Sequence, residues 1–150
     1  MTTTTIFPSK LLPKFKVWLD SQNFTHFMTL VFNRPETLDS ARDKLKKFHA
    51  NIDRRILGTN WYKKPPEERT FFIAFPEHIQ SNLHYHLLTR VNREHIERFE
   101  QHAPDVWETL VKSGSIDIQP FTGRLDYCLK EQYKDQNYRA FIISREFCSK

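Results

Sequence analysis

Hydrophobic residues along the chain recur with two periods, one typical of strands and one typical of helices. Residues 24–32 (FTHFMTLVF), 70–75 and 83–91 are apolar runs of strand length. Between the first two runs, apolar residues recur at spacings of three and four, as one buried face of a helix requires: Leu38, Ala41, Leu45, Phe48, Ile52 and Ile56. The pattern predicts a strand, a long helix that stops at Gly58, and two strands joined by a hairpin-sized connection.

The segments on either side of this helix are less regular. Residues 8–22 predict a short leading helix that is amphipathic and interrupted near Pro13. Residues 59–69, which contain two adjacent prolines, predict a loop. Trp61 and Tyr62 could form a short strand at the start of that loop.

The second half of the chain continues the alternation of strands and helices. Residues 93–112 predict a second helix, which Pro104 must interrupt or restart because proline lacks the amide hydrogen. Residues 115–121 predict a fourth strand, and residues 123–134 predict a final helix. Residues 139–144 (RAFIIS) could close the sheet as a fifth strand.

The predicted order of elements after the leading helix is β-α-β-β-α-β-α-β. Two strands joined as a hairpin and flanked by strand–helix units favour an α+β fold. We expect a ferredoxin-like or RRM-like antiparallel sheet of about five strands with flanking helices. A chain of 150 residues is the size of one domain, whose core we expect at about residues 24–144.

Charge and cysteine content narrow the class of protein. The net charge of +5 favours a polyanionic partner such as nucleic acid, although the basic residues of the long helix could simply form its solvated face. Cys128 and Cys148 are the only cysteines, and neither belongs to a CxxC motif, which excludes a cysteine zinc site and favours reduced thiols in a cytosol. No apolar run reaches the roughly 20 residues needed to cross a bilayer. We therefore expect a cytoplasmic protein with no membrane association.

Two histidines on one strand are the strongest candidates for chemistry. His84 and His86 alternate with Tyr85, so both imidazoles project from one face, about 7 Å apart along the strand. They could bind one metal ion, or they could be structural histidines. Glu77 is the expected third ligand if the hairpin closes near residues 81–82, although it could be an exposed loop carboxylate; His26 is a weaker candidate.

A tyrosine near the start of the final predicted helix is a candidate nucleophile. Tyr127 and Lys130 share a helix face, and Lys130 and Arg124 could supply a positive field that stabilises a phenolate. Tyr133 lies six residues further on and cannot share that face, so it is a rival and not a partner. On local sequence alone, a tyrosine near a helix start is usually a core or interfacial residue, so Tyr127 gains weight as a nucleophile only from its context.

Three motifs in this order resemble those of the HUH endonucleases, and among them the rolling-circle replication initiators (Rep proteins) of plasmids and phages. Residues 27–32 (FMTLVF) resemble the first apolar motif of that family. Residues 83–88 (LHYHLL) resemble the His-hydrophobic-His motif, and residues 127–130 (YCLK) resemble the Tyr-x-x-Lys motif. The resemblance spans about residues 24–131, which is most of the chain.

The resemblance implies a metal-dependent nickase of single-stranded DNA. Tyr127 would attack a phosphodiester and form a 5′-phosphotyrosine link, assisted by Lys130. His84 and His86 would hold Mg²⁺ or Mn²⁺, with Glu77 as the acidic ligand. The substrate would be single-stranded DNA or a hairpin origin. Residues expected to contact that DNA are Arg124, Lys134, Arg90, Lys46 and Lys47.

Several alternatives remain open at this point. With only 3 glycines the chain has no room for the glycine-rich phosphate loop of a helicase, so a host or plasmid helicase would be needed. A single-tyrosine transposase or relaxase of the same superfamily would share the site. A non-catalytic nucleic-acid-binding module of the same fold would leave the histidines idle. An unrelated metal-dependent hydrolase would use water in place of Tyr127.

Overall fold

The computed structural model describes residues 12–123, 125 and 141–148. The helices and longer strands within these residues follow the predicted order: α1 (Leu12–Asp20), β1 (His26–Val31), α2 (Leu38–Leu57), β2 (Phe71–Glu77), β3 (His84–Arg90), α3 (Ile96–Leu110) and β4 (Ser115–Pro120). A short strand, β5 (Ile142–Ile143), follows near the end of the described chain. None of the helices in this part of the chain combines the length and the apolar character that crossing a bilayer would require.

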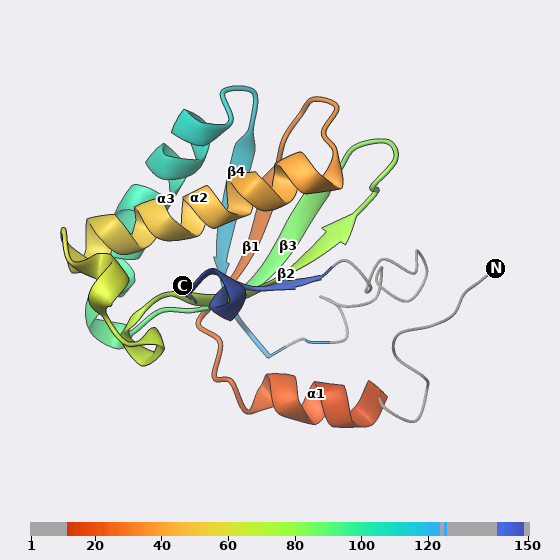
Figure 1. Cartoon of the computed structure of the whole chain (residues 1–150). Helices are drawn as coiled ribbons and strands as arrows, with labels where there is room; N and C mark the ends of the chain where they lie inside the picture. Colours follow the sequence, from red (N-terminus) through yellow and green to blue (C-terminus); the bar gives the residue numbers. More distant parts are fainter. Residues whose placement is uncertain (1–11, 124, 126–140, 149–150) are drawn as a thin grey trace.

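The strands form one antiparallel sheet in the order β4-β1-β3-β2-β5 (Figure 1). Strand β1 lies between β3 and β4, so the β2–β3 hairpin is extended by strands that are distant in sequence. Together with the helices after β1 and β3, this order is the ferredoxin-like α+β arrangement that the sequence predicted.

Helices α2 and α3 cover one face of the sheet, which we call the helix face (Figure 1). Met28 and Leu87 of the sheet pack there with Phe48 of α2 and Trp107 of α3, and all four are essentially inaccessible to solvent. Burying side chains of this size contributes about 1.5–3 kcal/mol each. This cluster forms the main core.

The opposite face of the sheet, which we call the open face, carries a second and smaller core. Phe71, Ile73 and Phe75 of β2 and Leu88 of β3 pack there with Leu19 of α1. Because side chains alternate along β2 and both of its faces are buried, this strand is apolar at nearly every position. Among the described residues, this second core covers the open face near β2.

Residues at both ends of helix α2 explain where it begins and ends. The Thr37 side chain caps its first turn by accepting a hydrogen bond from the Ser40 amide at 3.1 Å. Gly58, with φ of 92°, follows its last turn and adopts a conformation that suits glycine. The predicted stop at Gly58 is confirmed.

A buried polar cluster on the helix-face side of the sheet connects α2 to the residues just before β2. Asp53 accepts hydrogen bonds from the Arg69 Nε at 2.8 Å and from the Thr70 amide at 3.0 Å. His49 Nε2 lies 2.7 Å from the Thr70 carbonyl oxygen, and burial lowers the pKa of His49. Asp53 is fully buried, so Arg69 compensates its charge without help from solvent.

Four local predictions differ from the structure. Trp61 begins a 3₁₀ turn (Trp61–Lys63) and not a strand; this turn contacts α2, and the Arg69 guanidinium lies 5.0 Å from the centre of the Trp61 ring. Pro104 lies inside α3 without breaking it, because apolar packing on both sides of the proline holds the helix together. Residues 93–95 form a 3₁₀ turn before α3. Pro13 occupies the first turn of α1, where the missing amide hydrogen costs little, and so does not interrupt it.

Candidate metal centre

Glu77, His84 and His86 are brought together by the β2–β3 hairpin. In the register of these strands Glu77 lies directly opposite His84, and Phe75 lies opposite His86. Since side chains two residues apart share a face, all three polar side chains project from the open face. Strand β2 runs two residues further than predicted, to Glu77, and His78, with φ of 55°, follows it.

The ligand atoms of these side chains converge on one point. One carboxylate oxygen of Glu77 (Oε1) lies 3.2 Å from His84 Nε2 and 3.0 Å from His86 Nε2. One ligand atom from each of the three residues lies within 4.8 Å of the others. Two imidazole nitrogens and a carboxylate oxygen at this spacing could hold one metal ion. The predicted grouping of these three residues is confirmed.

The other ring nitrogens of the two histidines have their own partners. His84 Nδ1 donates to the Asn82 carbonyl oxygen at 3.0 Å, and His86 Nδ1 lies 3.2 Å from the Thr29 hydroxyl of β1. A proton held at Nδ1 leaves the Nε2 lone pair of a neutral imidazole available to a metal ion. The Phe27 ring also stacks on His86, with centroids 5.2 Å apart. Neighbouring groups therefore hold both rings in the orientation that a ligand needs.

Electrostatics at this cluster favour a cation. Burial alone would raise the pKa of Glu77, but hydrogen bonds from His84 and His86, and their charge when protonated, lower the pKa to about 2. The hydrogen bond with Glu77 outweighs burial and raises the pKa of His84. Glu77 is therefore an anion at neutral pH, and the positive charge near it is supplied by protons that a metal ion could replace.

Access to the cluster is one-sided. The Glu77 side chain is only 4% exposed, whereas the His84 and His86 side chains are 15% and 21% exposed. The carboxylate thus lies beneath the two imidazoles, whose edges are open to solvent on the open face. A bound ion could retain positions for water or substrate on that side.

The other histidine considered as a ligand is directed elsewhere. His26 of β1 belongs to the helix face, where its Nε2 lies 2.8 Å from a Glu100 carboxylate oxygen of α3. Because it projects from the face opposite to the metal cluster, it does not join the group of Glu77, His84 and His86. His78 stacks on the His84 ring with centroids 5.4 Å apart, but no ligand atom of His78 belongs to the group of three.

Several predicted site residues lie outside the described residues. These are the predicted nucleophile and its neighbours: Tyr127, Lys130, Arg124, Lys134 and the rival Tyr133. The final helix predicted for residues 123–134 also falls almost entirely outside them. The described residues on either side, Leu125 and Phe141, both belong to the apolar cluster of the open face.

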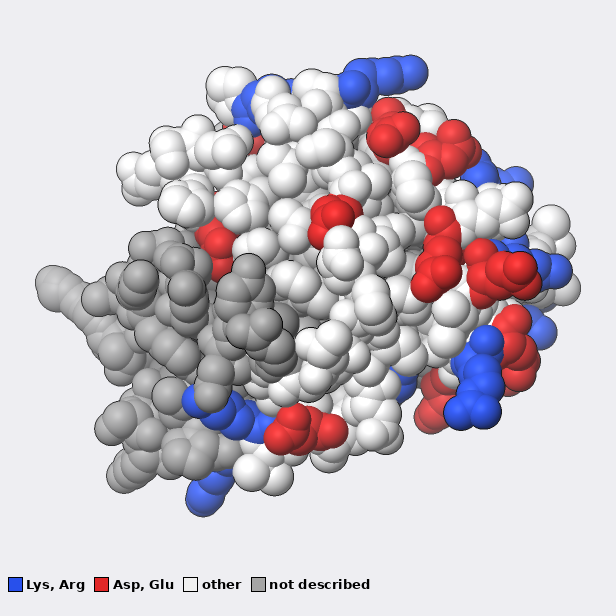
Figure 2. Space-filling model, turned by 180° about the vertical axis from the view of Figure 1, so that it is seen from behind, with Lys and Arg blue, Asp and Glu red and all other residues white. Residues whose placement is uncertain are grey.

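The remaining predicted DNA contacts are not gathered around the metal cluster. Arg90 projects from the open face, but its guanidinium lies over the Phe71 ring at 4.7 Å and donates to the Gln22 carbonyl oxygen at 3.1 Å. Lys46 and Lys47 belong to α2 on the other side of the sheet, where Lys47 pairs with Asp43 at 3.1 Å. Figure 2, which views the side away from α2, shows Lys and Arg mainly at the margins of the described surface.

Sequence reasoning missed the groups that orient the two histidines. Thr29 lies in the apolar run of β1. The alternation of side chains along that strand places it on the same face as Phe27, but nothing else in the sequence marks it as part of the site. Its position beside His86 depends on the β1–β3 register, which a single sequence does not reveal. The Asn82 contact uses a backbone oxygen, for which side-chain identity carries no information.

Comparisons with known proteins add no relatives to this description. No protein-family model, curated protein or solved structure gives a significant match to the chain. The fold and the Glu77–His84–His86 cluster therefore have to be interpreted on their own chemistry.

Proposed function

We propose that the protein is a metal-dependent endonuclease of single-stranded DNA that resembles the HUH nickases. The observation that carries this proposal is the convergence of Glu77 Oε1 with the Nε2 atoms of His84 and His86 on an accessible sheet face. Two imidazoles and a carboxylate suit Mn²⁺ well and accept Mg²⁺ less readily, because Mg²⁺ prefers oxygen ligands. The ion would polarise a bound phosphate and neutralise the charge that develops on it.

Tyr127 is the proposed nucleophile. Its phenol oxygen would form a bond to phosphorus as the bond to the 3′ oxygen breaks, and the released oxygen would leave as a 3′-hydroxyl after taking a proton. The phenol proton would pass to solvent, and Lys130 would favour the phenolate by its charge. Support comes from Leu125 and Phe141, because the described chain leaves and re-enters on the open face that carries the histidines.

The proposed biological role is initiation of rolling-circle replication of a plasmid or phage in the cytoplasm. The motif Tyr127-Cys128-Leu129-Lys130 favours an initiator over the single-tyrosine transposases and relaxases, because Lys130 completes Tyr-x-x-Lys. A separate helicase would expose the strand. A hairpin origin or single-stranded DNA would be the partner, since the attacked phosphodiester must be unpaired.

An adduct assay tests this function. Labelled single-stranded oligonucleotides of mixed sequence are incubated with the protein and Mn²⁺, and the products are separated on a denaturing protein gel. We expect a labelled band at the mass of a protein–DNA conjugate, and we expect Tyr127→Phe to remove it while Tyr133→Phe retains it. Cleavage without a conjugate would mean that water attacks, as in an unrelated metal-dependent hydrolase. Binding without cleavage or conjugate would mean a non-catalytic module.

A further inference from the structure

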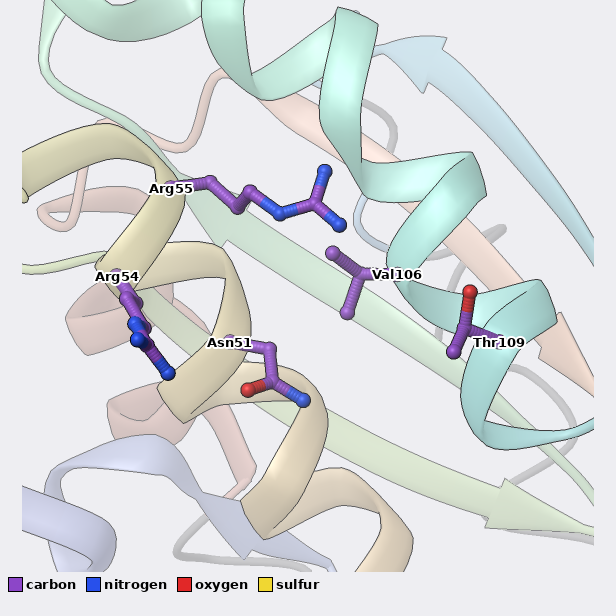
Figure 3. A pocket seen from close by; sticks show the side chains of 5 residues that line it. All are labelled: Asn51, Arg54, Arg55, Val106 and Thr109. Carbon is purple, nitrogen blue, oxygen red and sulfur yellow. The ribbon is translucent and has the colours of Figure 1, made fainter.

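A groove between α2 and α3 lies on the opposite side of the sheet from the metal cluster (Figure 3). It has a volume of about 400 Å³, and its lining consists of Asn51, Arg54, Arg55, Val106 and Thr109. Two of these residues are cationic, two offer neutral hydrogen-bond donors, and none is a carboxylate. The four polar lining residues are all exposed, so a large ligand can reach them. The lining is therefore suited to an anion.

Arg55 is held in place across this groove. Its Nη2 donates to a carboxylate oxygen of Asp105 on α3 at 2.9 Å, and its Nη1 lies 3.1 Å from His102 Nδ1. Figure 3 shows the side chain reaching from α2 toward α3. A guanidinium has five N–H donors, so these contacts fix its direction and leave donors for a further ligand. The charge of Arg55, however, is balanced by Asp105.

Arg54 supplies the charge that is not balanced. Within the described part of the chain its side chain makes no hydrogen bond or ion pair, and in Figure 3 it extends beside Asn51 on the α2 side of the groove. A cation in the last turn of a helix also stabilises that helix, by about 0.3–1 kcal/mol. Stabilising the helix end, however, does not account for the groove or for the hydrogen-bond donors of Asn51 and Thr109 beside Arg54.

We propose that this groove binds a backbone phosphate of double-stranded DNA, as a second contact separate from the metal cluster. One unbalanced guanidinium matches the single charge of a phosphodiester better than the double charge of a free phosphate or a terminal phosphoryl group. Asn51 and Thr109 would donate to the remaining phosphate oxygens, as neutral side chains commonly do at nucleic-acid backbones. The choice of DNA over other phosphodiesters rests on the proposed function, in which the stem of a hairpin origin adjoins the nicked strand.

Duplex binding and its salt dependence test this proposal. The affinity of the full chain for a short fluorescent DNA duplex is measured by anisotropy over a range of salt, with EDTA present so that no metal ion bridges the DNA to the protein. Arg54→Gln should lower the affinity several-fold, and it should reduce the slope of log affinity against log salt by about 0.9, the value of one phosphate contact. Asn51→Asp, which adds a carboxylate to the groove, should have an effect of at least the same size.

Two controls decide the interpretation. Arg54→Lys should recover most of the affinity, and Arg93→Gln, which removes an exposed arginine outside the groove, should leave the slope unchanged. Wild-type affinity and slope for both groove variants would overturn the proposal, as would an equal loss in Arg93→Gln. If inorganic phosphate shifts the Asn51 and Thr109 NMR signals while Arg54→Gln leaves duplex binding intact, the groove is a free-phosphate site and the proposal is wrong. The adduct assay on single strands reports separately on the proposed function.

Discussion

Two histidine–carboxylate clusters stand on opposite faces of the same sheet and differ in how each carboxylate is compensated. Asp53 is fully buried and bound by the Arg69 guanidinium and the Thr70 amide. Glu77 is nearly as buried, but the groups that compensate it are His84 and His86. An arginine keeps its proton at every accessible pH, whereas an imidazole exchanges one near neutrality.

This difference separates a structural cluster from one that can bind a ligand. The Asp53 cluster has a permanent cation inside it and no exposed edge, so a metal ion would have to displace Arg69 and lose that contact. The Glu77 cluster is held by exchangeable protons beneath two partly exposed rings, so an ion can take their place from the open face. A histidine near a carboxylate is thus informative only when its neighbours and its exposure are known.

The largest effect is expected when one of the three proposed metal-binding side chains is removed. We expect His86→Ala to weaken Mn²⁺ binding by more than about 100-fold, since even residues that only support a ligand cost 10–100-fold. Metal-dependent cleavage should disappear with it. Isothermal titration calorimetry measures the affinity, and His78→Ala is the matched control, because His78 stacks on His84 without supplying a ligand atom. An equal loss in His78→Ala would contradict the assignment of three ligands.

Disturbing the buried cluster should affect stability and not metal binding. Asp53→Asn leaves Arg69 without its anion and should lower the free energy of unfolding by about 3–5 kcal/mol. Asp43→Asn, an exposed aspartate of the same helix paired with Lys47, should change it by less than about 1 kcal/mol. Urea unfolding of both variants measures the difference. A similar small loss for both would mean that Arg69 does not depend on Asp53.

Acid should weaken the metal-free protein through Glu77. Because the folded pKa of about 2 lies below the ordinary value of 4.5, its contribution is present above pH 4.5 and is lost as pH falls toward 2. The loss should be on the order of 2–3 kcal/mol. Urea unfolding in EDTA between pH 2 and 5 measures it, and Glu77→Gln should flatten this part of the curve.

Above neutral pH the metal-free protein should lose stability as pH rises, because the pKa of His84 is raised in the folded state. Its contribution to the metal-free protein is complete below the ordinary value of 6.5 and is lost as pH rises through the raised pKa. Mn²⁺ affinity should increase over the same range, since the ion replaces the proton. A pH-independent Mn²⁺ affinity would show that His84 does not exchange a proton for the ion.

The smallest effect is expected at the residue that orients His86. Thr29→Val keeps the shape of the side chain and removes the hydroxyl beside His86 Nδ1. We expect a loss of Mn²⁺ affinity of about 10-fold, at the low end for a supporting group, with unchanged thermal stability. Thr29→Ser, which retains the hydroxyl, should restore the affinity, and failure to do so would assign Thr29 a packing role.

Much of the fold follows from pattern because periodicity and local caps determine it. The stripe from Leu38 to Ile56 and the stop at Gly58 predict α2, and the alternation around Tyr85 predicts that His84 and His86 share a face. What pattern could not provide depends on contacts distant in sequence. Thr29 lies beside His86 only once β1 and β3 pair, and Arg69 forms its ion pair with Asp53 only in the folded protein. The burial that keeps α3 helical through Pro104 also requires the folded sheet.

The three proposed ligands also come from a single hairpin of ten residues, Glu77 through His86. Closing so short a loop costs little chain entropy, so the centre can form before β1 and β4 dock around the hairpin. Because an ion that binds the closed hairpin favours it over open chains, Mn²⁺ should act during folding as well as after it. Refolding in the presence of the ion should accordingly be faster than refolding in EDTA, with the ion serving as a template for the strands that follow.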